Sequence, residues 1–433
     1  MKFIYPKKSV QFQNLLTPKD YDVVQMIFEH SGIQKRLEGY PNDPDFYPNY
    51  AWLNRSLPTP QSMLETIALM RGKGLRASII LPARNEAINI GRTLEQMMFF
   101  REFQLGNIAV YDNSSNDNTR EIVQAMNVPL FKAEECGLEY KIPDEIHHKG
   151  TNMWFGIMNA LRTEKDPTKH LVIFADTDVG LSIIELMQIL RAFAEKPSLK
   201  LILPFVSRLT KKGEDNGTLT SGGRASRFTW GPMRDALLSS YLRDITEHPA
   251  QLAGIYGANL EFITHIDIPH GFGVETAIQT EAYIYAYRHR MCANDVIQFV
   301  PCGIYSQVGQ SDHNIRLMAH DITHELMMRV NILKTQRIID LFHAMDINSK
   351  SNTSVSHERL SKNICEVLGI EIPQRLPNAK HILARRKLLT DYIWTVTNEQ
   401  VKGLDNQTIY RIVYYLPPAA QYLKSFLEEN NDC

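Results

Sequence analysis

The chain has 433 residues, of which 44% are hydrophobic and 22% charged, and its formal net charge is −1. This composition is typical of a soluble globular protein with a sizeable core, and the near-neutral charge gives no general attraction to nucleic acid or an anionic membrane. We find neither an apolar run of the roughly 18–20 residues that span a bilayer nor a signal-peptide segment. The five scattered cysteines indicate reduced thiols, so we expect a cytoplasmic protein.

The first 75 residues contain no strand-rich pattern. Residues 16–37 have the spacing of a helix, and residues 39–50 are rich in proline, asparagine and aspartate, as loops are. We therefore expect an N-terminal helical extension over residues 1–75.

From Arg76 onward, short apolar strands alternate with amphipathic helices. The spacing predicts strands within 76–86, 107–112, 171–175 and 199–207, and helices around 90–98, 120–126 and 147–162. This alternation predicts an α/β fold with a mostly parallel sheet that helices cover on both faces. Beyond residue 280 we expect a largely helical chain, with a polar linker at 348–358 and helices at 380–396 and 410–429.

Unusual polar clusters follow three of the predicted strands, at 84–86, 112–117 and 176–178. In open α/β sheets, ligands bind outside the carboxyl ends of the strands. We therefore expect the three clusters to form one shared site.

The cluster at 176–178 has the pattern Asp-x-Asp directly after an apolar strand. Residues two apart on an extended backbone point to the same side, so Asp176 and Asp178 can address one ligand together. Hard carboxylate oxygens suit Mg²⁺ or Mn²⁺, which complete their coordination with waters and substrate phosphates. The alternative is an ordinary turn after a strand, where aspartate is common.

Three further residues could serve a nucleotide. Glu86 could accept hydrogen bonds from a ribose or a base, or it could favour a helix N-terminus. Asp112 could accept from a nucleobase N–H, or it could cap a loop. Lys149 stands at the start of a predicted helix, where a cation is unfavourable, so we expect an anionic partner such as a phosphate; the alternative is a surface lysine.

These segments resemble a known family. "IILPARNE", "VYDNSSNDNT", "HKGTNMW" and "VIFADTDV" are similar to the nucleotide-binding half of GT-A glycosyltransferases, above all to the retaining glucosyl-3-phosphoglycerate synthases, relatives of mannosylglycerate-type synthases. "SGGRASRFTWGPM", "QLAGIYGAN" and "PHGFGVETAI" resemble later segments of that family. The likeness spans about residues 76–330. It implies a Rossmann-like GT-A fold with a nucleotide-sugar-binding half at 76–205, an acceptor-binding half at 206–335 and a C-terminal helical appendage at 336–433.

The resemblance also implies roles for individual residues. Asp178 would ligate the metal, and the catalytic set would be Asp178, Lys149, Arg224 and Glu275. Gly223, Arg224 and Ser226 would hold the acceptor, with Ser226 replacing the family's threonine. The residues around the nucleotide sugar would be Pro82, Ala83, Asn85, Glu86, Asp112, Asn113, Lys149, Asp176 and Thr177.

The sequence departs from the family pattern in two places. Ile255 stands where the family has a glutamate. Direct spacing does not return the family's metal-binding histidine: counting straight reaches Gln307, and a short gap reaches His313, which we prefer as the second metal ligand. His320 and His270 are the other candidates; His320 and His324 lie one helical turn apart but lack a nearby third ligand for zinc.

The implied reaction is transfer of glucose from a nucleoside-diphosphate sugar to the 2-hydroxyl of 3-phosphoglycerate, with Mg²⁺ or Mn²⁺ as cofactor and retention of configuration. We expect no nucleic-acid or membrane partner, and a homodimer. Mannose, glycerate or glycerol phosphate could replace the sugar or the acceptor. Nucleotidyl transfer is a further alternative, although "LPARNEAINIGR" is not the Gly-rich basic loop that it requires. A non-enzymatic scaffold is the remaining one.

Overall fold

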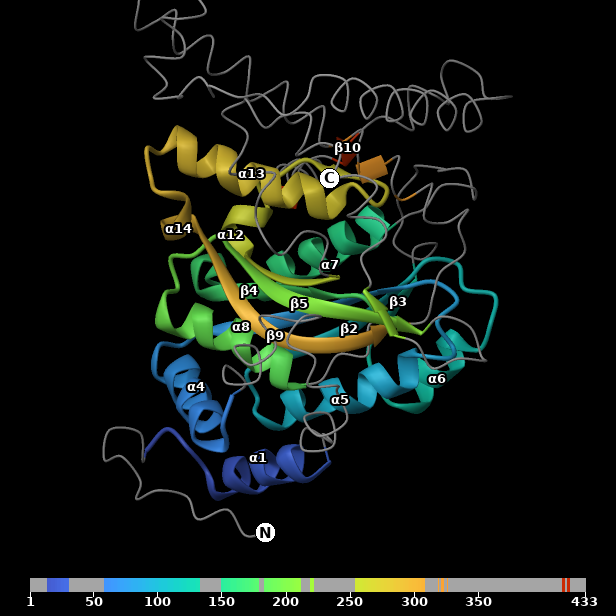
Figure 1. Ribbon diagram of the computed structural model, residues 1–433, viewed down its shortest axis with the longest axis vertical. Helices are drawn as coiled ribbons and strands as arrows, with labels where there is room; N and C mark the ends of the chain where they lie inside the picture. Colours follow the sequence, from blue (N-terminus) through green and yellow to red (C-terminus); the bar gives the residue numbers. More distant parts are fainter. Residues whose placement is uncertain are drawn as a thin grey trace, which may run out of the picture.

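A twisted sheet lies between two layers of helices in the computed structural model of the protein (Figure 1). The structure describes residues 14–30, 58–132, 149–178, 183–211, 219–221 and 254–307, together with Met318, Asp321, Ile322, Glu325, Tyr415, Leu416, Ala419 and Ala420.

Within the described ranges, the main sheet has eight strands. Strands β3, β2, β1 and β4 run parallel, β7 is antiparallel to both β4 and β5, β5 pairs with β6 antiparallel, and β9 runs parallel to β5. Their order is β3 (Leu130–Lys132), β2 (Gly106–Asp112), β1 (Arg76–Ala83), β4 (His170–Ala175), β7 (Ile255–Asn259), β5 (Leu201–Lys211) and β6 (Leu219–Ser221), with β9 (Ile297–Gln307) beside β5.

Helices cover both faces of this sheet (Figure 1). One layer contains α4 (Pro60–Gly72), α5 (Ile90–Glu102), α6 (Thr119–Ala125) and α8 (Ile183–Glu195), with α1 (Pro18–His30) against α4. The other contains α7 (Lys149–Thr163), α12 (Leu260–Ile263), α13 (Val274–Arg288) and the short α14 (Ala293–Val296). None of the described helices is long and apolar enough to cross a bilayer.

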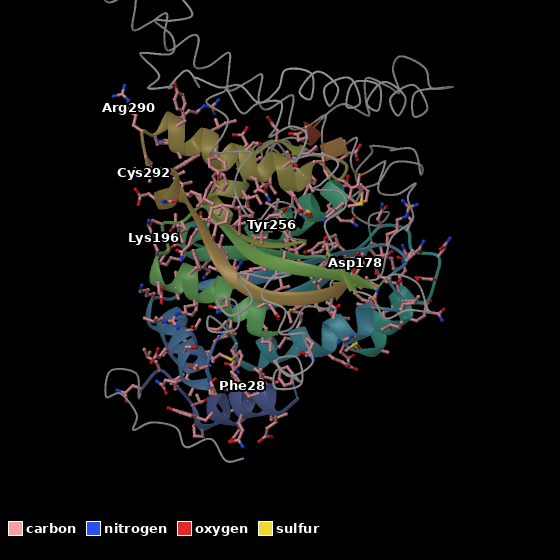
Figure 2. The ribbon with its side chains drawn as sticks, in the orientation of Figure 1. Phe28, Asp178, Lys196, Tyr256, Arg290 and Cys292 are labelled. Atoms are coloured by element: carbon pink, nitrogen blue, oxygen red, sulfur yellow. The ribbon has the colours of Figure 1, made fainter. Side chains whose placement is uncertain are left out.

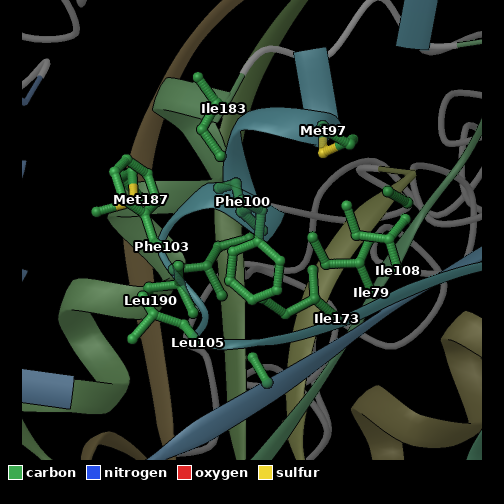
Figure 3. Close-up of a cluster of buried hydrophobic side chains, with 14 of the residues drawn as sticks. Ile79, Met97, Phe100, Phe103, Leu105, Ile108, Ile173, Ile183, Met187 and Leu190 are labelled. Atoms are coloured by element: carbon green, nitrogen blue, oxygen red, sulfur yellow. The ribbon is translucent and has the colours of Figure 1, made fainter. Parts of the chain in front are cut away.

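The two central strands are buried on both faces because helices lie above and below them. All six residues of β4 are buried, and so are six of the eight in β1. Continuous apolar runs of this kind are typical of covered parallel strands. On the α5 and α8 side, Ile79 and Ile173 of the sheet pack with Phe100 and Leu190 of the helices (Figure 3).

An ion pair fixes the N-terminal helices to the sheet layer. Arg71 of α4 donates to the buried Asp20 of α1 at 2.6 and 2.8 Å, and also to the carbonyl of Phe103, just beyond α5, at 2.9 Å. Burial alone would raise the pKa of Asp20, but the hydrogen bonds from Arg71 and Thr17 outweigh it and lower the pKa. The helix predicted within 16–37 is therefore present as α1 and is firmly docked.

The predicted α/β fold is confirmed, with three differences. Our prediction missed α8 and the antiparallel strand β7. The largely helical chain expected beyond residue 280 is wrong for β9, an eleven-residue strand whose partner β5 lies far away in sequence. The helix expected at 410–429 is wrong at Tyr415–Leu416, which form the strand β10. Two prolines follow Leu416 in the sequence, and a proline disfavours helical backbone in the residue before it.

Candidate active site

The three polar clusters after β1, β2 and β4 meet at one edge of the sheet. Ala83 lies opposite Asp112 in the parallel pair β1–β2, and the Asn113 N–H donates to the Ala83 carbonyl at 3.0 Å. The Thr93 hydroxyl donates to the Thr177 carbonyl at 3.0 Å, which connects α5 to the turn after β4. The expectation that the clusters lie together is therefore confirmed.

The loops after β1 and β2 hold each other in shape. Asn85 has a left-handed backbone (φ 56°), a conformation that asparagine tolerates better than most residues. Its N–H donates to the Ser115 hydroxyl at 2.8 Å, and its side-chain oxygen accepts from the Asn116 N–H at 2.9 Å. The next N–H, that of Glu86, donates to Thr119 Oγ1 at 2.8 Å. These bonds place the Glu86 carboxyl at the sheet edge.

Asp112 is fully buried within this pair of loops. Its Oδ2 accepts from the Ser115 N–H at 3.1 Å and from Arg120 Nε at 2.6 Å, and the Ser115 hydroxyl donates to Oδ1. Asp112 therefore orders the loop after β2. A nucleobase could reach its carboxylate only by displacing Arg120 or Ser115, so the predicted direct contact with a base does not fit this arrangement.

A buried lysine joins two carboxylates beside the turn after β4. Lys149 Nζ lies 2.7 Å from Asp176 Oδ1 and 2.5 Å from Glu275 Oε1. The lysine side chain is 14% exposed and that of Glu275 only 6%, whereas the Asp176 side chain is half-buried at 26%. The anionic partner expected for Lys149 is thus supplied by the chain itself, from β4 and from the first turn of α13.

The close approach of α7 to the loop after β8 (Ile268–Pro269) positions Lys149. The carbonyl of His270 accepts from the N–H groups of Gly150 at 2.8 Å and Thr151 at 3.3 Å, which satisfies two donors at the start of the helix. Thr151 Oγ1 also lies 3.0 Å from His270 Nδ1. A Cβ on Gly150 would lie 1.8 Å from the Pro269 carbonyl oxygen, so only glycine permits this contact.

The charged groups of the cluster shift one another's pKa values. Burial would lower the pKa of Lys149, but Asp176 and Glu275 outweigh it and hold the pKa above its usual value. Burial raises the pKa of Asp176; Lys149 opposes this, Glu275 and Asp178 add like charge, and the result is about 6. The lysine therefore stays charged and is the cation that keeps this buried site from carrying only negative groups.

Two further carboxyl groups lie next to this cluster, those of Asp178 and Glu86. Asp178 follows Thr177 at the end of the sheet (Figure 2). Burial and then the charge of Asp178 raise the pKa of Glu86 to about 7. Crowded carboxylates with oxygen donors fit a hard divalent cation. Within the described part of the chain, no group of three or more His, Cys, Asp and Glu side chains is arranged to hold a metal, so further ligands would come from other residues or a substrate.

Several predicted site residues lie outside the described residues: Gly223, Arg224 and Ser226 of the expected acceptor loop, and the metal candidates His313 and His320, with their neighbour His324. Of the histidine candidates, His270 is described, and its Nδ1 is next to Thr151. Ile255, which stands where the resembled family has a glutamate, is fully buried in the core on the α5 and α8 side. An apolar side chain suits this position.

Tyr256, which sequence reasoning did not single out, lies beneath the lysine cluster. It is on β7, opposite Phe174 of β4, and points to the α7 side, where its hydroxyl is 4.0 Å from the Met153 sulfur (Figure 2). Burial raises its pKa, and the charges of Glu275 and Asp176 raise it further. The phenol is therefore a neutral donor below two carboxylates, and only the sheet pairing reveals this.

Comparison with solved structures gives the fold a name. No protein-family model and no curated protein matches the sequence. Glucosyl-3-phosphoglycerate synthase of Mycobacterium tuberculosis, solved with Mn²⁺, UDP-glucose and phosphoglyceric acid, is 19% identical with a TM-score of 0.50; the match covers 62% of this chain and 83% of the synthase. The same enzyme with Mn²⁺, UDP and glucosyl-3-phosphoglycerate is 20% identical at the same TM-score and coverage.

A third structure, of a mycobacterial protein, is 20% identical with a TM-score of 0.50, and the match covers 61% of this chain and 78% of that protein. At sequence identities of 19–20%, these structural matches establish a shared fold and no more. The order of β3, β2, β1 and β4, the antiparallel β7 and the site at the carboxyl ends of the strands agree with it. The chain thus has the GT-A fold and resembles the glucosyl-3-phosphoglycerate synthases at the level of that fold.

Proposed function

We propose that the protein is a metal-dependent retaining glycosyltransferase that moves glucose from a nucleoside-diphosphate sugar to the 2-hydroxyl of 3-phosphoglycerate. The observation that carries the proposal is the charged cluster of the buried Glu275 and the half-buried Lys149 and Asp176 at the carboxyl edge of a GT-A sheet. Such a cluster adds little net stability, since an apolar cluster of similar volume is often as stable, so we assign it a role in the reaction. The structures of similar fold contain Mn²⁺, UDP-glucose and phosphoglyceric acid, which supports this choice of substrates.

The nucleotide would lie over the paired loops after β1 and β2. Asn85 and Glu86 are exposed or half-buried there, while Asp112 and Arg120 keep the loop in shape from below. Pro82, Ala83 and Asn113 complete the surface that we assign to the nucleoside. This division makes Glu86 a direct contact and Asp112 a positioning residue.

Asp178 would hold the divalent ion, together with diphosphate oxygens and with a further ligand such as His313. Such an ion, when bound, supplies Lewis-acid stabilisation of the leaving diphosphate. Asp176 and Thr177 would line the same turn. Lys149 stays protonated, and in our proposal it stabilises developing negative charge on the leaving group while Glu275 holds the sugar hydroxyls.

The acceptor would bind at Gly223, Arg224 and Ser226. Two glycines let backbone N–H groups approach an anion, and an arginine offers a bidentate fork to a phosphate or a carboxylate. Mannose as the sugar, or glycerate or glycerol 3-phosphate as the acceptor, is the alternative within the same chemistry. The homodimer and the cytoplasmic location expected from the sequence stay predictions.

A substrate panel tests the proposal directly. UDP-, GDP- and ADP-glucose and GDP-mannose are each combined with 3-phosphoglycerate, glycerate and glycerol 3-phosphate, with Mn²⁺, with Mg²⁺ and with EDTA. We expect metal-dependent formation of glucosyl-3-phosphoglycerate with an α-anomeric product by NMR. Absence of transfer and of donor hydrolysis across the panel would refute a glycosyltransferase.

Two variants test the site assignment. Asp178→Ala should abolish transfer and weaken Mn²⁺ binding, measured by the electron paramagnetic resonance signal of free Mn²⁺, while circular dichroism stays unchanged. Arg224→Ala should chiefly raise the KM for the acceptor. A rise in the donor KM alone would mean that the two substrates are assigned to the wrong places.

A further inference from the structure

The C-terminal segment of the chain returns to the candidate active site. Tyr415 and Leu416 form β10, which pairs antiparallel with β8, so that Tyr415 lies opposite Pro269 and Leu416 opposite Ile268. Figure 1 shows β10 beside α13, although the two are far apart in the sequence. This contact adds a strand to a two-residue element that is not part of the main sheet.

Two further contacts fix the segment. Ala419 is 1% exposed and belongs to the apolar cluster formed by α7, α12 and α13. The Ala420 N–H donates to the Thr264 carbonyl at 3.1 Å, at the end of α12. Pro269 has no N–H to offer to β10, so these two contacts supply much of the attachment.

The residue after β8 carries this attachment to the active site. His270 accepts the first N–H groups of α7, those of Gly150 and Thr151, and Lys149 immediately precedes them. The same loop then continues into α13 and delivers Glu275 to Lys149. A displacement of β8 would therefore move both partners of the lysine–glutamate pair.

We propose that Tyr415, Leu416, Ala419 and Ala420 form a positioning element: by pairing with β8 and packing beside α12 they fix the loop at 268–273 and thereby place Lys149 and Glu275. The segment contributes no group to the reaction itself. Its effect on transfer rests on the proposed function, whereas its effect on the start of α7 does not. The strand that pairs with β8 is thus β10 of the same chain.

Hydrogen exchange provides a test that is independent of activity. Ala419→Asp places a carboxylate among apolar side chains and should detach the segment, whereas Ala420→Asp, at a half-buried position, is the matched control. We expect exchange of the Gly150 and Thr151 amides to accelerate at least tenfold in Ala419→Asp and to stay unchanged in Ala420→Asp. Peptides from β1 and β2 should exchange as in the wild type. Unchanged protection at Gly150 in a variant whose Leu416 and Ala419 amides exchange freely would overturn the proposal.

A disulfide rescue covers the case in which the charge unfolds the protein. Leu416 and Ile268 are directly opposite in an antiparallel pair, where Cα atoms lie about 4.5–5.5 Å apart. This separation is within the roughly 4.4–6.8 Å that a disulfide spans, so we choose Leu416→Cys with Ile268→Cys for the bridge. In the Ala419→Asp background, oxidation should restore amide protection and reduction should remove it. In the transfer assay, detachment should lower kcat at least tenfold with little change in the acceptor KM, and oxidation should restore it. If oxidation restored amide protection but not kcat, the segment would position the start of α7 without a role in transfer. If oxidation restored neither amide protection nor kcat, both the positioning and its role in transfer would be refuted.

Discussion

Polar side chains gather at the amino ends and at the carboxyl ends of strands β1 and β4. At the amino ends the basic group is neutral, whereas at the carboxyl ends it is charged. At the amino ends, the fully buried His170 has Nε2 2.9 Å from the Ser78 hydroxyl and Nδ1 3.4 Å from Glu164 Oε2. Burial, followed by the charge of Arg76, lowers the pKa of His170 to about 3. The imidazole is therefore neutral at physiological pH, and this end of the sheet avoids a buried cation.

At the carboxyl ends the charges are kept. Lys149 remains protonated because Asp176 and Glu275 flank it, and the charge of the nearby Asp178 raises the pKa of Glu86. Keeping charged groups out of water costs free energy, and apolar side chains of similar volume would avoid that cost. One end of the same two strands therefore favours stability of the fold, while the other end keeps the charge that a phosphate-containing substrate and a divalent ion would use.

The largest effect is expected from removing the buried cation. Lys149→Met leaves Asp176 and Glu275 facing each other without a counterion, and breaking a buried pair in this way costs about 3–5 kcal/mol of stability. Transfer should fall at least about 100-fold, as it does when a group that stabilises developing charge is lost. Chemical denaturation and product formation measure the two effects.

The double variant Lys149→Met with Glu275→Gln tests whether lost stability alone explains lost transfer. It removes one of the two unpaired charges, so most of the lost stability should return while transfer stays low. If activity returned together with stability, Lys149 would be a structural residue, and the contrast between the two ends of the sheet would fail.

Next in size is the contact that places the lysine. Gly150→Ala would put a Cβ 1.8 Å from the Pro269 oxygen, so α7 or β8 must shift. Overpacking of this kind costs about 1–3 kcal/mol, and we expect kcat to fall because Lys149 moves with its helix. Gly91→Ala on α5 is the matched control, since its new Cβ would be in ordinary contact with Ile122 at 3.5 Å. A stable, fully active Gly150→Ala variant would show that Lys149 needs no such positioning.

Much of this site could be predicted from local sequence. Asp176 and Asp178 follow an apolar run, and a strand that ends in paired acids at the carboxyl edge of a parallel sheet is readable without the structure. The charge at the start of α7 also signalled that Lys149 requires an anionic partner. That partner's identity was not readable, because Glu275 is 126 residues away and meets Lys149 only through the pairing of loops.

The remaining misses have the same cause. Strand β9 is specified by β5 across the sheet, and Tyr256 is selected by β7 pairing with β4; neither relation leaves a periodic trace in the sequence. Asp112 illustrates the converse. Its place after a strand was predicted correctly, but whether its oxygens face a ligand or Arg120 depends on a side chain from the following helix. Local pattern predicts elements and strand ends, whereas side-chain partners depend on tertiary contacts.

The smallest effect on transfer is expected at the amino ends of the strands, where a substitution should change the pH dependence of stability instead. The pKa of His170 is lower in the folded protein, about 3, than its usual 6.5, so between these values the unfolded chain binds a proton that the folded chain does not. This contribution to stability is complete above pH 6.5 and decreases by about 1.4 kcal/mol per pH unit as the pH falls toward 3.

His170→Gln, which can keep the contact with Ser78, should show a shallower loss of stability in urea titrations between pH 7.5 and 4.5. Its transfer rate at pH 7.5 should equal that of the wild type, because the amino ends of β1 and β4 lie at the opposite edge of the sheet from Asp178. An equal pH slope in the two proteins would mean that His170 takes up a proton in the folded state, and a lower transfer rate would mean that the two ends are coupled.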